Sequence, residues 1–293
     1  MTRSPLPHSP ASPQAPATPL APFLESALLR DAGFVHGFFT RQGGVSEGPY
    51  ASLNTTTVTG DDPAHVEENL RRIARALGVD SARLYFLTQV HGIDCIEVDG
   101  SQPRDAVLPL RGDTVVARAS TEPLACAVRT ADCVPVLLGC VDSGAVAACH
   151  AGWKGCAQGA ILAAVRALRD RGGTRLVAAI GPHISLTSFE VSEDVAAELL
   201  AASPDKTVVD RSRDRPHVDL RRLARAQLES LDIPRTSIDD VPGCTVLDAA
   251  RFFSFRRDRE QSGRLLSAIV PRDIASRAVA DAHASAANAP NSR

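Results

Sequence analysis

The chain lacks several features that would place it in a specialised class of protein. It has no apolar run long enough to span a bilayer, and its proline-rich start lacks the apolar core of a secretory signal. Its formal net charge of −2 gives no electrostatic reason to expect a nucleic acid or an anionic membrane as partner. Its seven cysteines, an odd number, fit reduced thiols better than a disulfide framework. We therefore expect a cytoplasmic protein without nucleic-acid or membrane partners.

The motifs of several large enzyme classes are also missing. No Walker motif or dinucleotide fingerprint is present, so nothing supports a nucleoside-triphosphate or NAD site. The eight histidines include no His-x-His pair, and the only methionine is Met1. Laccase-type oxidases use paired His-x-His motifs, and a blue-copper site usually adds an axial Met to two His and one Cys. The sequence therefore disfavours copper-dependent oxidation.

What is present is a globular composition between two atypical ends. Of the 293 residues, 44% are hydrophobic and 23% are charged, which suffices for one large domain or two small ones. Residues 1–22 are rich in proline, and residues 272–293 are rich in Ala, Ser and Asn. We expect a disordered first tail and a flexible last tail on either side of one catalytic domain at residues 23–271.

Within that domain, strand-like and helical segments follow one another without a regular βαβ alternation. One helix is predicted to start at Asp61-Asp62-Pro63 and to stop at Gly78, because its apolar residues recur on one helical face. Further helices are predicted over Cys156–Arg169, Glu193–Ala202 and Leu220–Leu231. Strands are predicted over Phe34–Phe39, Leu84–Val90, Ile93–Val98, Thr114–Ala117, Leu124–Val128, Val134–Val141, Ala145–Cys149, Leu176–Ile180 and Leu265–Val270. Several connections are too short for a crossover helix, so we expect an α+β fold. Its large mixed or antiparallel sheet assembly is covered by helices in α/β/β/α-type layers.

Three residues with metal-binding side chains, His91, Cys133 and His150, each follow a predicted apolar strand. Three strand ends can converge on one point even though these residues are far apart in the sequence, unlike the paired ligands of a zinc finger. Two imidazoles and a thiolate suit zinc, and three protein ligands leave the fourth tetrahedral position open to water or substrate. The pattern therefore predicts one catalytic zinc ion.

Several motifs occur in an order that resembles one bacterial family. They are TRQGGVSEGPYASLN (Thr40–Asn54), TQVHG (Thr88–Gly92), TADCVPVLL (Thr130–Leu138), HAGWKG (His150–Gly155), SFEV (Ser188–Val191) and FFSFRRD with a following GRL. Over Phe34–Val270 the chain resembles the YfiH-like family. That family was long labelled multicopper polyphenol oxidase, or laccase-domain, and is now described as zinc-dependent purine nucleoside phosphorylases. The resemblance implies zinc ligands at His91, Cys133 and His150.

The resemblance also implies an activity. Its members cleave adenosine, inosine, guanosine or methylthioadenosine with phosphate, giving free base and ribose 1-phosphate. Some also deaminate adenosine, since zinc lowers the pKa of the water that it binds and so provides a nucleophile for C6 of adenine. The expected partners are therefore purine nucleosides and phosphate, and the sequence does not fix the oligomeric state.

Phosphorolysis needs an anion site as well as a metal. Arg41 precedes a glycine-rich turn that ends near Ser46. Such a turn exposes backbone N–H groups and Arg offers a forked donor, so this segment is predicted to bind phosphate. The alternative is a plain turn with a surface arginine. Asn54 and Arg129 are weaker candidates for polar contacts with the substrate.

Asp132 stands next to the proposed thiolate ligand and has two candidate roles. It either carries a proton or orients a zinc-bound histidine. A regular strand through Thr130–Val134 would point Asp132 and Cys133 to opposite faces, which counts against both entering one site.

Two alternative functions use the same residues. In the first, the protein is a cysteine or zinc amide hydrolase that edits peptidoglycan precursors, as has been proposed for family members. In a cysteine hydrolase, Cys133 would be the nucleophile and a nearby His its base. In the second, the protein is a binding module without catalytic activity, and zinc only stabilises its fold. Such a structural site needs a fourth protein ligand, for which Cys149 is the candidate. The apolar run before Cys149 favours a buried core thiol instead.

Overall fold

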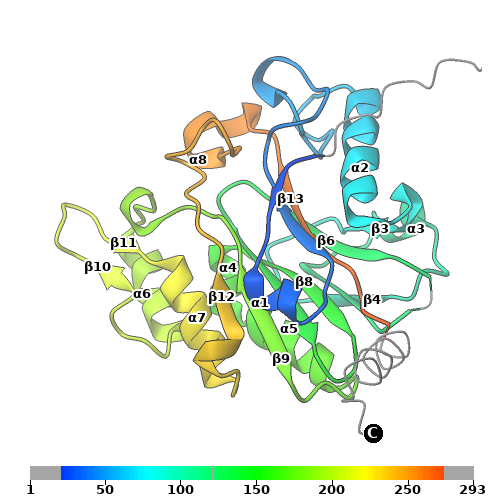
Figure 1. Ribbon diagram of the computed structural model, residues 1–293. Coiled ribbons are helices and arrows are strands. Elements are labelled where there is room, and N and C mark those ends of the chain that lie inside the picture. Colours follow the sequence, from blue (N-terminus) through cyan, green and yellow to red (C-terminus); the bar gives the residue numbers. More distant parts are fainter. Residues whose placement is uncertain (1–20, 121, 274–293) are drawn as a thin grey trace, which may run out of the picture.

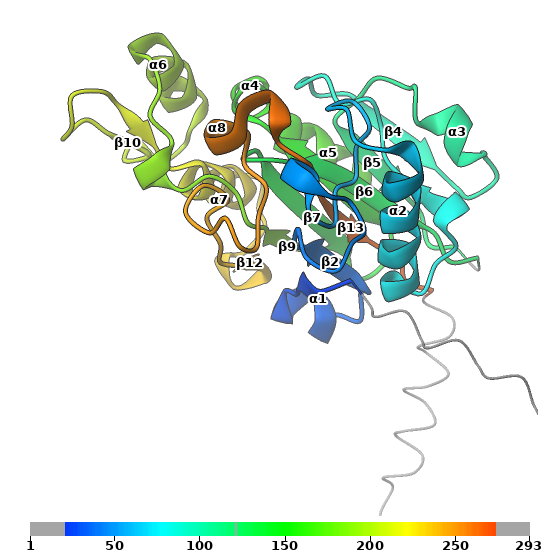
Figure 2. The same ribbon diagram turned by 90° about the horizontal axis from the view of Figure 1, so that it is seen from above.

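Two β-sheets stack face to face and carry helices on their outer faces (Figures 1 and 2). The computed structural model describes residues 21–120 and 122–273. Residues 1–20 and 274–293, which make up most of the two predicted tails, lie outside this range. Ala21, the first residue of the described range, is buried, with 1% of its surface exposed.

The first sheet has five strands, and most of its neighbours are antiparallel. Its order is β1 (Phe23–Leu24), β2 (His36–Phe39), β13 (Leu265–Ile269), β6 (Ala125–Thr130) and β3 (Leu84–Tyr85). The second sheet has six strands and is parallel only at its two edges. Its order is β12 (Ile238–Asp240), β9 (Leu176–Ile180), β7 (Val134–Cys140), β8 (Val146–Ala151), β5 (Thr114–Ala117) and β4 (Cys95–Val98). A small ribbon pairs β10 (Val209–Asp210) with β11 (His217–Val218).

Side-chain alternation along β7 shows how the layers form. Leu137 points into the core between the sheets, whereas Val136 and Leu138 face the helices of the second sheet. Those helices are α5 (Ala160–Arg169), α6 (Glu193–Ala202) and α7 (Leu220–Ser230). On the other side of the molecule, α2 (Pro63–Leu77) packs on the first sheet (Figure 1). The predicted α+β fold with a mixed sheet assembly and helical outer layers is therefore confirmed.

Local signals set most helix boundaries. The Asp62 carboxylate caps α2 by accepting a hydrogen bond from the Ala64 N–H at 2.8 Å, and Gly78 ends the helix at φ +70°. The helix predicted over Cys156–Arg169 is in fact two, because Gly159 at φ +97° separates α4 (Trp153–Gln158) from α5. The other short helices are α1 (Ala27–Asp31), α3 (Arg104–Val107) and α8 (Phe255–Asp258).

The strand predicted over Leu84–Val90 is also shorter than expected. Only β3 pairs with β6, and the chain then leaves the first sheet. Thr88 forms an isolated bridge with Arg111, which precedes β5 of the second sheet. The segment therefore carries His91 across from one sheet toward the other.

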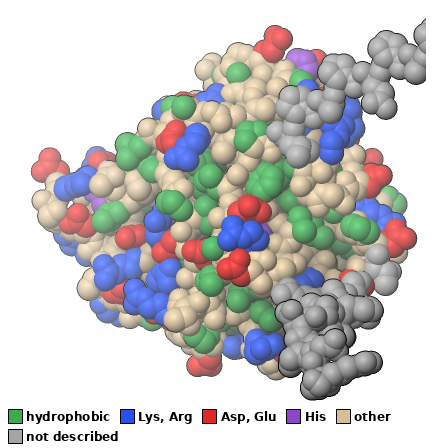
Figure 3. All heavy atoms as spheres, in the orientation of Figure 1, with side chains coloured by type: hydrophobic (Ala, Val, Ile, Leu, Met, Phe, Trp, Pro, Cys, Tyr) green, Lys and Arg blue, Asp and Glu red, His purple; other side chains and the backbone are tan. Residues whose placement is uncertain are grey.

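Among residues 21–120 and 122–273, no helix combines the length and the apolar character that crossing a bilayer requires. On the face shown in Figure 3, basic side chains are interspersed with acidic ones.

Candidate functional site

His91, Cys133 and His150 meet where segments of the two sheets come together. His91 lies in the turn before β4, Cys133 lies in the turn between β6 and β7, and His150 lies within β8. One ligand atom from each side chain falls within 4.8 Å of the other two. The Cys133 Sγ is 3.9 Å from the His91 Nε2. The centres of the His91 and His150 rings are 4.9 Å apart, and the ring planes are inclined at 76°. The structure thus brings the three residues together in a group that could hold a metal ion.

A buried carboxylate, Asp113, organises two of these three residues. It accepts hydrogen bonds from the backbone N–H groups of Val90, His91 and Gly92, at 3.2, 2.9 and 2.7 Å. Its Oδ1 also lies 2.7 Å from the His150 Nδ1. This contact leaves the Nε2 of His150 as the nitrogen available to a metal. Sequence reasoning missed Asp113, and the only available signal was a carboxylate placed directly before a buried strand.

Close packing around the cluster explains the glycine of the HAGW motif. A Cβ atom at Gly152 would lie 2.8 Å from the His91 Cδ2 and 3.1 Å from the Cys133 Sγ. His91 itself has φ +60°, a left-handed conformation that non-glycine residues adopt only at a cost. Its N–H bond to Asp113 stabilises that conformation.

The thiol and the imidazoles shift each other's proton affinity. Burial alone would raise the pKa of Cys133, but the facing His150 and His91 rings lower it to about 6. Burial alone would lower the pKa of His150, but Cys133 and Asp113 raise it to about 9. Without a metal, the pair is therefore a thiolate beside an imidazolium at neutral pH.

Alkylation of the metal-free protein by iodoacetamide should detect the Cys133 thiolate. Because the pKa of Cys133 is lowered, its thiolate is present above pH 6 and is lost as the pH falls through that value. We expect modification with a midpoint near pH 6, read by mass spectrometry of peptides, and protection when metal is bound. Cys126 is the internal control, because burial raises its pKa and it should stay unmodified throughout. A midpoint above pH 8 at Cys133 would contradict the ion pair.

Asp132 does not hold either histidine. It lies in the turn between β6 and β7 at φ +95°, so the regular strand that would have pointed it away from Cys133 is absent. Its carboxylate accepts hydrogen bonds from the Thr245 hydroxyl at 2.6 Å and from the Arg256 N–H at 2.5 Å. Asp132 therefore ties the turn that carries Cys133 to the first residues of α8, and the histidine contact belongs to Asp113.

A cavity of about 640 Å³ opens beside the metal-binding cluster. All three cluster residues line it. One part of its wall is aromatic or aliphatic and includes Trp153, Ile184, Phe189, Leu220 and Phe255. Another part is cationic and is formed by Arg129, Arg256, Arg259 and Arg264. Its volume is typical of sites for small organic ligands.

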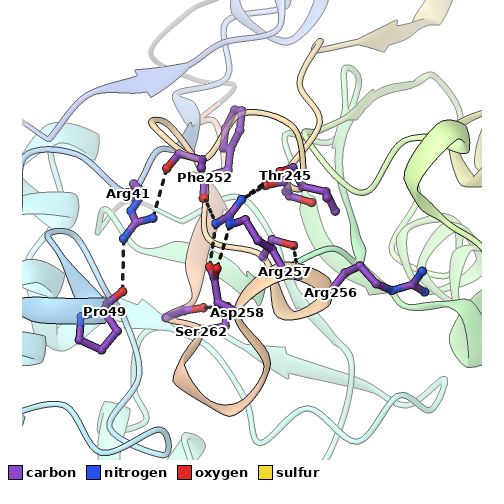
Figure 4. A network of polar contacts seen from close by, with 12 residues as sticks. Arg41, Pro49, Thr245, Phe252, Arg256, Arg257, Asp258 and Ser262 are labelled. Atoms are coloured by element: carbon purple, nitrogen blue, oxygen red, sulfur yellow. Dashed lines mark hydrogen bonds and ion pairs between the residues drawn. The ribbon is translucent and has the colours of Figure 1, made fainter.

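The glycine-rich turn predicted to bind phosphate does not reach this cavity. Arg41 directs its guanidinium to the carbonyls of Pro49, Ala51 and Ala249, and Figure 4 shows it beside Pro49. Its guanidinium carbon also stacks 4.3 Å from the centre of the Phe253 ring. These contacts direct three of its five N–H donors to carbonyl groups of the protein, and Arg41 is not part of the cavity wall.

Ser46 and Asn54 likewise have structural partners. The Ser46 hydroxyl accepts a hydrogen bond from the Asn69 amide, and the buried Asn54 amide donates to Asp61 at 2.8 Å. Neither residue lines the cavity. Of the predicted substrate-binding residues, only Arg129 is part of the cavity wall.

Arg256 and Arg257 are adjacent in the sequence, but only Arg256 lines the cavity. Arg256 lines the cavity but donates to the carbonyls of Ser188 and Glu190. Arg257 pairs with Asp258 and donates to the Thr245 carbonyl, inside the network of Figure 4.

Comparison with known proteins places this architecture in a family. The model of the multi-copper polyphenol oxidoreductase laccase family matches residues 35–272. The chain belongs to this family. A purine nucleoside phosphorylase of Streptomyces griseus is 42% identical over 236 residues, which cover 80% of this chain and 93% of that protein. Another, of Deinococcus radiodurans, is 38% identical over 81% of this chain and 89% of its own length.

Solved structures agree with the family assignment. YlmD of Geobacillus stearothermophilus superposes with a TM-score of 0.77 at 31% identity, covering 86% of this chain and all of that one. YfiH of Bacillus licheniformis gives a TM-score of 0.74 at 29% identity, covering 81% and 92% of the two chains. The resemblance to YfiH-like proteins inferred from the motifs is thus confirmed.

Proposed function

We propose that this protein is a zinc-dependent purine nucleoside phosphorylase that acts in the cytoplasm, with its catalytic domain at residues 23–271. The observation that carries the proposal is the His91–Cys133–His150 cluster, which opens directly into a cavity with apolar and cationic walls. The names of the relatives, which are 38–42% identical, support the same activity.

The donor set of the cluster fits zinc. Two imidazole nitrogens and one thiolate form three tetrahedral positions, and ligand atoms around one zinc ion lie roughly 3.3 to 3.8 Å apart. The 3.9 Å between the Cys133 Sγ and the His91 Nε2 is close to that range. When bound, zinc supplies a Lewis acid and lowers the pKa of a coordinated water. Asp113 would hold the backbone of His91 and orient the ring of His150 toward the metal.

The cavity wall matches the parts of a nucleoside. Trp153, Phe189 and Phe255 offer aromatic surface for a purine base, and the arginines offer charge for phosphate. In the reaction, a phosphate oxygen bonds to the anomeric carbon while the bond from that carbon to the purine nitrogen breaks. The base then leaves with the bonding electron pair and gains a proton. Adenosine, inosine, guanosine and methylthioadenosine are the proposed substrates.

A side activity on adenosine is part of the proposal. Zinc chemistry that activates water also suits deamination at C6 of adenine. A second candidate, amide hydrolysis by Cys133 as nucleophile, is favoured by one observation, the lowered pKa of its thiol beside His150. The two candidates differ in whether the metal is needed.

The test is chromatography of the purified protein after incubation with inosine and with adenosine, each with and without phosphate. A zinc assay on the same sample accompanies it. We expect phosphate-dependent release of hypoxanthine and adenine from zinc-loaded protein, with ammonia from adenosine as a minor product. Zinc-loaded protein that releases neither base nor ammonia would refute the proposal and direct attention to amide substrates.

A further inference from the structure

The nearly buried guanidinium group of Arg129 forms part of the cavity wall. It lies in β6, and its guanidinium carbon is 4.8 Å from the centre of the Phe86 ring. Its two terminal nitrogens donate to the carbonyls of Thr55 and Leu87 at 3.4 and 3.2 Å. An arginine has five N–H donors, so these two long bonds leave donors free to meet a ligand. Burial and the charge of Arg264 lower the pKa of Arg129 to about 10, which keeps it cationic at neutral pH.

Arg264 precedes β13 and lines the same cavity. Its Nη1 donates to the carbonyls of Ser262 and Gly263 at 2.7 and 3.1 Å. Its Nε and Nη2 have no hydrogen-bond partner within residues 21–120 and 122–273. Arg264 shares the cavity wall with Asp132 and Cys133 of the metal-binding turn. Burial lowers the pKa of Arg264, and the charges of Cys133 and Asp132 offset part of that effect.

Asn54, the last residue of the TRQGGVSEGPYASLN motif, and the following Thr55 hold the backbone of Arg264. The side-chain oxygen of Asn54 accepts the backbone N–H of Arg264 at 2.8 Å, and the Thr55 hydroxyl donates to the Arg264 carbonyl at 2.9 Å. Asn54 is fully buried, and its amide is held in turn by Asp61. This framework fixes the backbone of Arg264 on the cavity wall.

Neither Arg129 nor Arg264 forms an ion pair with a carboxylate in the described part of the chain. Holding two like charges close together in a partly buried wall costs free energy that a bound anion would repay. The nearest carboxylate on the metal-binding turn, Asp132, is already occupied by Thr245 and by the N–H of Arg256.

We propose that Arg129 and Arg264 form the subsite for inorganic phosphate, the nucleophile of the reaction, next to the metal-binding cluster. This inference depends on the proposed function for its role in turnover, but not for phosphate binding itself. The two guanidinium groups hold the phosphate dianion by charge-assisted hydrogen bonds. Asn54 and Thr55 contribute indirectly, by holding the backbone of Arg264 in place.

The test combines kinetics with direct binding. Zinc-loaded wild-type protein is compared with the Arg264→Gln, Arg129→Gln and Arg264→Lys variants, and with Arg235→Gln as the matched control. Arg235 is 78% exposed and lies outside the cavity wall. The KM for phosphate is measured at saturating inosine, and the Kd for inorganic phosphate is measured by calorimetry. Thermal unfolding and zinc content establish that each variant is folded and loaded.

Both Gln variants should raise the phosphate KM and Kd by about tenfold to a hundredfold, the range expected for losing a charge-assisted bond to phosphate. The KM for inosine should change less than about twofold, and Arg264→Lys should recover part of the loss because it retains the charge without the fork. Folded Gln variants with wild-type phosphate binding would overturn the subsite. If wild-type protein binds phosphate through these arginines but releases no base, the subsite stands and the phosphorylase proposal fails.

Discussion

Replacing Cys133 by alanine is expected to reduce phosphate-dependent base release by about a thousandfold or more. The substitution removes one of three ligands and leaves two imidazoles, which cannot retain a zinc ion tightly. A catalytic metal contributes several kcal/mol of transition-state stabilisation, and each 1.36 kcal/mol changes the rate tenfold. The measurement is the initial rate with inosine and phosphate, with zinc content determined on the same preparation.

Cys244→Ala is the matched control. Cys244 is also partly buried with a lowered thiol pKa, but it contacts Ser185 and Ser188 and stands outside the metal-binding group. Its variant should keep its zinc and its rate within about twofold, as expected for a substitution away from the reacting groups. A fully active Cys133→Ala variant would contradict the zinc mechanism.

Chelation separates the two roles proposed for Cys133. Loss of the side chain inactivates both a zinc enzyme and a thiol nucleophile, so the variant alone does not distinguish them. Removing metal from wild-type protein should abolish base release, and adding zinc should restore it. A thiolate nucleophile beside His150 needs no metal, so amide hydrolysis that continues in a chelator would identify the hydrolase instead.

Much of the scaffold could be predicted because it follows local rules. The α2 boundaries come from Asp62, Pro63 and Gly78, whose conformational preferences act within a few residues. The strands of the second sheet are apolar on both faces because they lie between another sheet and helices, and such runs are easy to recognise. The convergence of the three metal-binding residues follows from those strands together with the family motifs.

The remaining parts of the site depend on contacts that no local pattern encodes. Arg41 and Arg264 both look like available cations in the sequence, yet one is satisfied by carbonyl groups and the other faces the cavity. The different roles of the two arginines depend on their contacts in the folded chain. Phe253 packs against the guanidinium of Arg41, whereas Asn54 accepts a hydrogen bond from the backbone of Arg264. Such long-range contacts become visible only in the folded chain.

Asp113→Ala should destabilise the protein and loosen the metal site together. The side chain is fully buried and is the acceptor for three backbone N–H groups around His91 as well as the partner of the His150 ring. The three N–H donors are part-buried, so leaving each unpaired should cost about 1 kcal/mol, and the free energy of unfolding should fall by about 3 kcal/mol. Urea unfolding of the metal-free protein measures this loss.

The same variant should bind zinc at least tenfold to a hundredfold more weakly, the usual consequence of losing the partner of a metal-binding histidine. Asp113→Asn is the informative companion, because it keeps one uncharged acceptor oxygen, which serves either the Val90 and Gly92 N–H groups or the His91 N–H and the His150 Nδ1. It should regain part of the stability while its zinc affinity stays reduced. If Asn restores stability and zinc affinity equally, the Asp113 charge does not tune the metal site, and its role is limited to holding the backbone around His91.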